Sequence, residues 1–223
     1  MLYIDYTKLT IGVYPDLDNV KAEQIRGYIG YLMLDDSGFS HHSDKLIYEY
    51  PKVQYRIING EIVIIGLKEY SNKIYILLDK LKSLIINKEY KIRYIKVENI
   101  KFLIDKEFST YRFITPWLAL NEINYRNFKN LDTKNKKDLL GRILIGNILS
   151  FLKGMDIHLD FKLVSQVSKF KTYTVYVNKN KFEGIKCKFM VNLTLPDFIG
   201  LGKSVSKGYG SIFRCKNDIR DNR

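Results

Sequence analysis

The chain has 223 residues, of which 46% are hydrophobic and 27% charged, with only four prolines and fourteen glycines. This composition is typical of a folded globular protein and excludes a disordered or fibrous chain. Lysine and arginine number 37 against 24 aspartates and glutamates, so the formal net charge of +13 favours polyanionic partners, nucleic acid first among them.

No stretch approaches 18 consecutive apolar residues, and the N-terminal residues lack the pattern of a signal peptide. The sequence therefore predicts a cytoplasmic protein with no membrane partner. The two cysteines, Cys187 and Cys215, have no nearby histidine or second cysteine at a metal-ligand spacing, so we interpret them as buried or incidental thiols. No pattern in the sequence predicts a metal or another cofactor.

The first half of the chain predicts the element order strand, helix, hairpin, helix, strand. Apolar stripes with a 3.6-residue period indicate the helices, and Asp18 is the expected N-cap of the first. Asn59-Gly60 is typical of the type I′ turn of a hairpin. This order is that of a ferredoxin-like fold, with two helices on one face of an antiparallel sheet and the other face open to RNA. The strands are predicted at 3–13, 46–58, 61–67 and 90–102, and the apolar stripes of the two helices span 25–33 and 74–85.

The second half predicts a strong helix over 136–153 followed by a series of strands. Its element order makes it a variant of the first half, although no sequence repeat is visible. We therefore predict an α+β protein with two ferredoxin-like (RRM-like) domains in tandem, residues 1–110 and 111–223, each an antiparallel sheet with helices on one face. The strands are expected at 158–164, 171–177, 184–194 and 209–214.

A glycine-rich segment, residues 200–210, is the strongest local signal. Glycines permit positive φ and let backbone N–H groups approach a phosphate, while lysines add charge and serines add donors. Asp197 and Val205 stand where a P-loop and a dinucleotide fingerprint each need glycine, so both nucleotide motifs are disfavoured. A simple glycine-rich turn remains the alternative. The candidate RNA-binding residues of this segment are Gly200, Gly202, Lys203, Ser204, Ser206, Lys207, Gly208 and Gly210.

The spacing of these glycines resembles the glycine-rich loop of the RAMP superfamily of CRISPR-associated proteins, in particular the endoribonucleases that process CRISPR precursor RNA. Residues 50–56, 113–121 and 140–147 also resemble one branch of that family, so the resemblance spans nearly the whole chain. It implies two ferredoxin-like domains with the glycine-rich loop in the second. It also implies CRISPR repeat RNA (pre-crRNA) as the partner, with an effector complex or a homodimer as further candidate assemblies.

Three histidines are the candidates for acid–base chemistry on RNA, since imidazole transfers protons near neutral pH. His41 and His42 lie in a polar segment after the first helix, where the resemblance implies a catalytic histidine, and we favour His42 slightly. An exposed pair without a role is the alternative that the sequence alone leaves open. His158 is interpreted as structural. The candidate cations for the charge that builds up on the phosphate are Lys45, Lys52, Arg56, Lys203 and Lys207, with Lys52 and Arg56 also expected to contact RNA.

The leading hypothesis is a metal-independent endoribonuclease that cuts within CRISPR repeats and leaves 2′,3′-cyclic phosphate and 5′-hydroxyl ends. A different class of function, a non-catalytic RNA-binding RAMP subunit of a CRISPR effector complex, fits the same loop. A ferredoxin-like protein that binds other structured RNA is a third, weaker interpretation. The adjacent histidines favour the enzyme.

Overall fold

The structure, a computed structural model, describes residues 1–40, 49–177 and 180–215. The first domain is a five-stranded antiparallel sheet in the order β2-β3-β1-β5-β4. This is the ferredoxin-like order with the short strand β4 added at one edge. Its elements are β1 (Leu2–Tyr14), α1 (Ala22–Leu32), α2 (Ser37–Ser40), β2 (Val53–Ile58), β3 (Glu61–Leu67), α3 (Glu69–Lys73), α4 (Ile76–Lys80), β4 (Ser83–Ile85) and β5 (Glu89–Ile104).

The second domain is a four-stranded antiparallel sheet in the order β7-β8-β6-β9. Both of its α-helices precede β7, and a single 3-10 turn stands between β8 and β9, where the first domain has helices. The prediction of an α+β protein with tandem ferredoxin-like domains is confirmed. The elements are β6 (Ser109–Phe113), α5 (Glu122–Asn130), α6 (Thr133–Gly154), β7 (Ser165–Val177), β8 (Asn180–Val191), η1 (Val205–Lys207) and β9 (Ile212–Arg214).

Several local predictions differ from the structure. The N-cap of α1 is Lys21, whose backbone N–H donates to the Gln24 side chain at 2.8 Å, and not Asp18. The predicted helix over 74–85 is shorter in the structure, where the range contains the helix α4 and the strand β4, because residues 83–85 pair with β5 instead of continuing the helix. The hairpin prediction is confirmed, since Asn59 and Gly60 both have positive φ, as a type I′ turn requires.

The segment 158–164 is not a strand, and the long strand β7 begins only at Ser165. The Asn192 side chain explains this, because its amide accepts from the backbone N–H of Val164 and donates to the carbonyl of Lys162. Those backbone groups therefore need no strand partner. His158 lies exposed in this segment.

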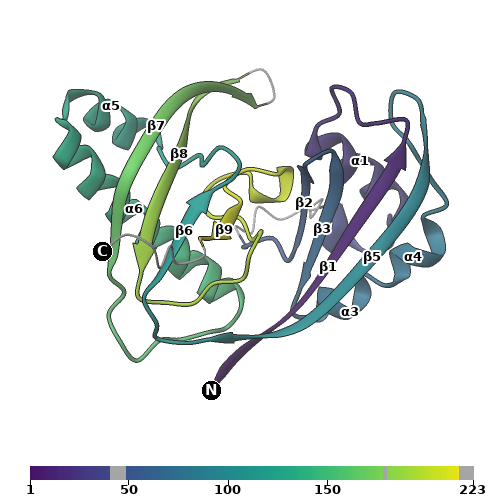
Figure 1. Cartoon of the computed structure of the whole chain (residues 1–223), viewed down its shortest axis with the longest axis horizontal. Helices are drawn as coiled ribbons and strands as arrows, with labels where there is room; N and C mark the ends of the chain where they lie inside the picture. The colour runs from purple at the N-terminus through teal and green to yellow at the C-terminus, as the bar shows by residue number, and fades with distance from the viewer. Residues whose placement is uncertain (41–48, 178–179, 216–223) are drawn as a thin grey trace, which may run out of the picture.

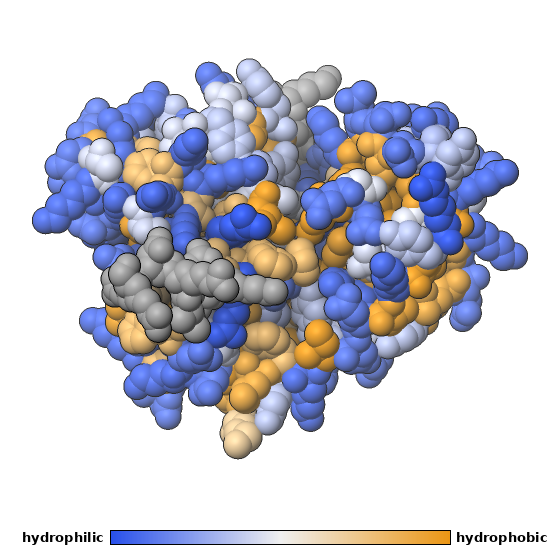
Figure 2. Space-filling model, in the orientation of Figure 1, coloured by the Kyte–Doolittle hydropathy of each residue, from blue (hydrophilic) through white to orange (hydrophobic). Residues whose placement is uncertain are grey.

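In Figure 1, α5 lies on the outer side of the second domain and α4 on the outer side of the first. The C-terminal end of α6 reaches the first domain, where the rings of Phe151 and Tyr50 meet with centroids 5.2 Å apart. One hydrophobic core contains residues of both domains, including Ile4 and Ile65 from the first and Phe189 from the second. On the face shown in Figure 2, hydrophilic side chains cover most of the surface, and hydrophobic ones gather near the middle and over the first domain.

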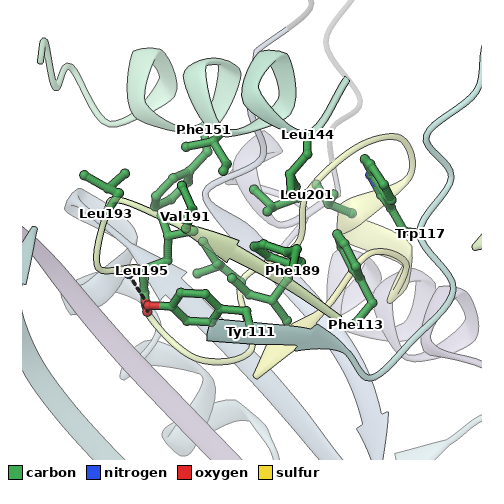
Figure 3. Close-up of a cluster of buried hydrophobic side chains, with 14 of the residues drawn as sticks. Tyr111, Phe113, Trp117, Leu144, Phe151, Phe189, Val191, Leu193, Leu195 and Leu201 are labelled. Atoms are coloured by element: carbon green, nitrogen blue, oxygen red, sulfur yellow. Dashed lines mark hydrogen bonds between the residues drawn. The ribbon is translucent and has the colours of Figure 1, made fainter. Parts of the chain in front are cut away.

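The glycine-rich segment, residues 200–210, is called the glycine loop below. Its Leu201 side chain is fully buried and points into the core beneath Leu144 of α6 (Figure 3). Next to it, the rings of Phe113 and Trp117 stack with centroids 4.8 Å apart. The loop is therefore anchored in the core of its own domain on one side.

On its other side the loop is held by Arg56 of the first domain. This guanidinium is fully buried, and Nε donates to the Phe198 carbonyl at 2.6 Å and to Ser211 Oγ at 2.8 Å. Nη1 donates to the carbonyls of Tyr55 and Val205, each at 3.1 Å. Burial lowers the pKa of Arg56 to about 10, which leaves it charged at neutral pH. The guanidinium of a β2 residue thus donates hydrogen bonds to three residues of the second domain.

Gln54 and Tyr50 extend this contact. Gln54 Oε1 accepts from Arg56 Nη2 and from the backbone N–H of Gly200, the latter at 2.9 Å. Gln54 Nε2 donates to Tyr50 Oη, which in turn donates to the Gly200 carbonyl at 2.6 Å. Val53 and Tyr55 point to the opposite, helix-covered face of the first sheet, because side chains alternate along β2.

We expect Arg56→Lys to lower the free energy of unfolding by about 3 kcal/mol, because a single ammonium cannot reach acceptors spread around a guanidinium, and buried carbonyls lose their partners. Urea unfolding followed by circular dichroism measures this change. Arg142→Lys, on the exposed side of α6, is the matched control and should change the free energy by less than about 0.5 kcal/mol. Equal small changes in both variants would contradict the role given to Arg56.

Candidate functional site

The glycine loop presents a run of free backbone donors. Within the described residues, the N–H groups of Gly202, Ser204, Val205 and Ser206 donate no hydrogen bond. Gly202 and Ser204 have φ of +98° and +56°, which turns the chain so that successive N–H groups can converge. Gly202 cannot carry a side chain, because a Cβ there would lie 2.8 Å from the Trp117 ring. Converging N–H groups of this kind bind anions such as phosphate.

These four residues line a cavity of about 160 Å³ together with Glu49, Tyr50, Pro51 and Ser150. A larger cavity of about 540 Å³ continues from Glu49, Tyr50 and Ser150 along the C-terminal half of α6. We call the two cavities together the loop groove. The larger one is also lined by Lys52, Lys68, Gly146, Leu149, Lys153, Gly154 and Asp156.

The predicted catalytic residues His41, His42 and Lys45 lie outside the described residues. Their described neighbours in the chain are fixed on both sides. Phe39 is fully buried, and its carbonyl accepts from Tyr55 Oη at 2.9 Å. Glu49 lines both cavities of the loop groove. Glu49, the first described residue after the segment that contains the histidines, therefore lies at the loop groove.

The predicted RNA-binding residues separate into three groups. Gly202, Ser204 and Ser206 line the smaller cavity, and Lys52 lines the larger one, where its ammonium is 2.6 Å from Glu69. Lys203 is exposed on the opposite side of the loop, and Lys207 and Gly208 are half-buried. Gly200, Gly210 and Arg56 are buried.

Arg56 has no exposed surface and bonds only within the protein, so we assign it to holding the loop and not to a contact with RNA. Gly200 and Gly210 have a similar packing role. A Cβ at Gly210, which has φ of +66°, would lie 2.0 Å from the Leu201 carbonyl oxygen. The sequence singled out the loop, but it could not separate the residues that hold the loop from those that face solvent.

Lys153 of α6 is a cation of the loop groove that the sequence did not single out. It is exposed and forms no ion pair with a described acidic residue, whereas Lys68 pairs with Asp156. It lies near the end of the predicted helix 136–153. Nothing in the sequence of that helix distinguishes Lys153 from the other lysines. Only the fold brings it to the cavity that Lys52 also lines.

A second basic surface lies on the open face of the second sheet. Lys169 of β7 is directly opposite Lys188 of β8, which is opposite Arg112 of β6, and Lys171 is opposite Lys186. All five are exposed and share one face, and none forms an ion pair with a described acidic residue. We call this set the basic face. Like charges directly opposed in a sheet are destabilising, and a bound polyanion would relieve that repulsion.

Among the described residues, no three histidines, cysteines or carboxylates are placed to hold a metal ion. Of the helices in that part of the chain, none is long and apolar enough to cross a membrane. Cys187 is buried, and burial raises the pKa of its thiol to about 12, as expected of a structural cysteine.

Comparison with solved structures gives two close matches. A crystal structure of Cas6b has a TM-score of 0.85 and 29% identity over 96% of this chain and 100% of that one. A crystal structure of the CRISPR RNA processing endoribonuclease Cas6b has a TM-score of 0.74 and 26% identity over the same shares. A Cas6-related protein from Pyrococcus furiosus, at 13% identity and a TM-score of 0.55 over 95% and 99% of the two chains, shares the fold.

Among curated proteins, the uncharacterized protein MJ0978 of Methanocaldococcus jannaschii is 42% identical over 123 residues, which are 55% of this chain and 84% of that protein. Two family models match nearly the whole chain, the Cas6b N-terminal domain over residues 2–102 and the Cas6b C-terminal domain over residues 103–215. The glycine spacing, the tandem ferredoxin-like domains and both family models agree, and the chain belongs to the Cas6b family of CRISPR-associated RAMP proteins.

Proposed function

We propose that this protein is a metal-independent endoribonuclease that binds CRISPR repeat RNA and cuts precursor crRNA within the repeats. The observation that carries the proposal is the loop groove, where four residues of the glycine loop with free N–H groups line the same cavity as Glu49, the first described residue after the segment that contains the histidines. Membership of the Cas6b family supports the substrate, since one solved relative is a CRISPR RNA processing endoribonuclease.

The reaction requires only groups that RNA and this chain supply. The 2′-hydroxyl loses its proton to a general base, and its oxygen bonds to the adjacent phosphorus. The bond from phosphorus to the 5′-oxygen breaks, and a general acid gives that oxygen a proton. The products are a 2′,3′-cyclic phosphate and a 5′-hydroxyl.

We assign the two proton transfers to His42 and His41, with Lys45 as a nearby cation. The scissile phosphate lies in the smaller cavity, on the N–H groups of Gly202, Ser204, Val205 and Ser206, which stabilise its growing negative charge. Lys153 and Lys52 add positive charge farther along the groove. The ion pair of Lys52 with Glu69 has to open before Lys52 can contact RNA directly.

We expect the double variant His41→Ala/His42→Ala to cut repeat RNA at least about 100-fold more slowly, because both proton carriers are removed. Its affinity for the RNA should stay within about twofold, since phosphate contacts dominate binding. Single-turnover cleavage in EDTA and filter binding measure the two quantities. His158→Ala, which changes the exposed third histidine, is the matched control and should cut at the normal rate.

Two results would contradict the mechanism: loss of cleavage by the unchanged protein in EDTA, or normal cleavage by the double variant. RNA that the unchanged protein binds but leaves intact for hours would favour the alternative, a non-catalytic RAMP subunit of an effector complex.

The basic face extends the RNA contact beyond the groove. We expect Lys171→Ala/Lys186→Ala to reduce the slope of log K against log salt by about 1.5 units, because each phosphate contact contributes about 0.7 to 0.9. The free energy of unfolding should not fall, since an opposed pair of like charges is removed. Titrations at several salt concentrations measure the slope.

Lys82→Ala/Lys91→Ala is the control for this experiment, because both lysines are exposed in the first domain, away from either basic surface. An equal change of slope in both double variants would mean that the basic face acts only through net charge.

A further inference from the structure

A third cavity, of about 450 Å³, lies where three segments of the second domain meet, and it shares no lining residue with the loop groove. We call it the α5 pocket. One wall is the start of α5, another is the start of β8, and the third is Lys203 of the glycine loop. It is lined by Leu120, Asn121, Glu122, Tyr125, Lys181, Phe182, Glu183 and Lys203.

The cations of the pocket come from two separate segments. Lys203 and Lys181 are both exposed, and neither forms an ion pair with an acidic residue in the described ranges. The backbone of Lys203 is fixed, since its N–H donates to the Leu118 carbonyl at 3.2 Å. Two lysines at one cavity are suited to bind a phosphate of the RNA beside the glycine loop.

The apolar wall of the pocket suits a planar ring. Tyr125 is half-buried and packs against the core, with the Lys129 ammonium 4.4 Å from its ring centroid. Leu120 is buried at the same cavity. Unpaired bases of RNA stack on aromatic side chains held in this way.

The polar groups of the pocket select among bases. Asn121 Oδ1 accepts from the Asn124 N–H at 2.7 Å, so its Nδ2 is left to donate. Glu122 is paired with Arg126, but the carboxylate of the half-buried Glu183 has no hydrogen bond or ion pair to any described residue. A carboxylate only accepts, and guanine is the base with two adjacent donors, N1–H and the N2 amine, to match its two oxygens.

We propose that the α5 pocket binds one unpaired guanine nucleotide of the RNA, with its base between Tyr125 and Glu183 and its phosphate at Lys203 and Lys181. This rests on the proposed function, because it takes the RNA substrate as given. It adds a base-specific contact to a surface whose other contacts are to phosphates. Cleavage chemistry and base choice then belong to different cavities on the two sides of the glycine loop.

Binding of short uridine oligonucleotides tests the proposal without cleavage. The probes are labelled hexamers of uridine with a single central guanine, adenine or inosine, and fluorescence anisotropy in EDTA gives the dissociation constants. The guanine probe should bind about tenfold more tightly than the adenine probe. Inosine lacks only the N2 amine, so the inosine probe should lose most of that advantage.

Two variants locate the preference. Glu183→Gln should reduce the guanine preference to about twofold, because an amide cannot accept both guanine hydrogens. Tyr125→Leu should weaken the guanine probe about tenfold while keeping the apolar packing. Tyr31→Leu, a change to a 70% exposed tyrosine of α1 in the first domain, is the control and should bind all probes normally. Thermal melting of each variant checks that it is folded.

Equal binding of the three base probes by the unchanged protein would overturn the proposal, as would a guanine preference that survives Glu183→Gln. Either result leaves the cleavage assays in EDTA unaffected, so failure of the α5 pocket and failure of the proposed endoribonuclease can be told apart.

Discussion

The buried guanidinium of Arg56 is the contact on which the rest of the arrangement depends. It arises from the first domain and donates to the Phe198 carbonyl, Ser211 Oγ and the Val205 carbonyl of the second domain, on either side of the glycine loop. A charge that has lost its water is stable only if its donors find acceptors. The position of the loop relative to the first domain is therefore fixed by the hydrogen bonds of Arg56 in addition to packing.

Held in this position, the glycine loop lines two different cavities. On one side, the residues with free N–H groups line the loop groove together with Glu49, and on the other, Lys203 lines the α5 pocket. The basic face lies on a separate surface formed by β6, β7 and β8. RNA that follows these surfaces meets backbone donors, lysines and an aromatic pocket in different places. Affinity, base choice and chemistry are then assigned to different residues on one rigid frame.

Local patterns in the sequence predicted most of the elements, because apolar periodicity and the Asn59-Gly60 turn act over short distances. The spacing of its own glycines marked the glycine loop, and the family resemblance was drawn from that spacing. The predictions that differ from the structure depend on distant residues. Arg56 is buried because the segment after residue 197 folds back onto β2. Residues 158–164 do not form a strand because the Asn192 side chain forms hydrogen bonds with their backbone. The basic face and the α5 pocket require strand register and the meeting of three segments, which no single stretch of sequence contains.

The most direct test of the central claim, attack by the RNA's own 2′-hydroxyl, uses repeat RNA with one 2′-deoxy nucleotide at the mapped cut site. In EDTA, we predict one cut per repeat in the unmodified RNA, with 2′,3′-cyclic phosphate and 5′-hydroxyl ends. The single 2′-deoxy substitution should abolish that cut while binding remains. Cleavage that persists on the substituted RNA, or products with 5′-phosphate ends, would contradict the account.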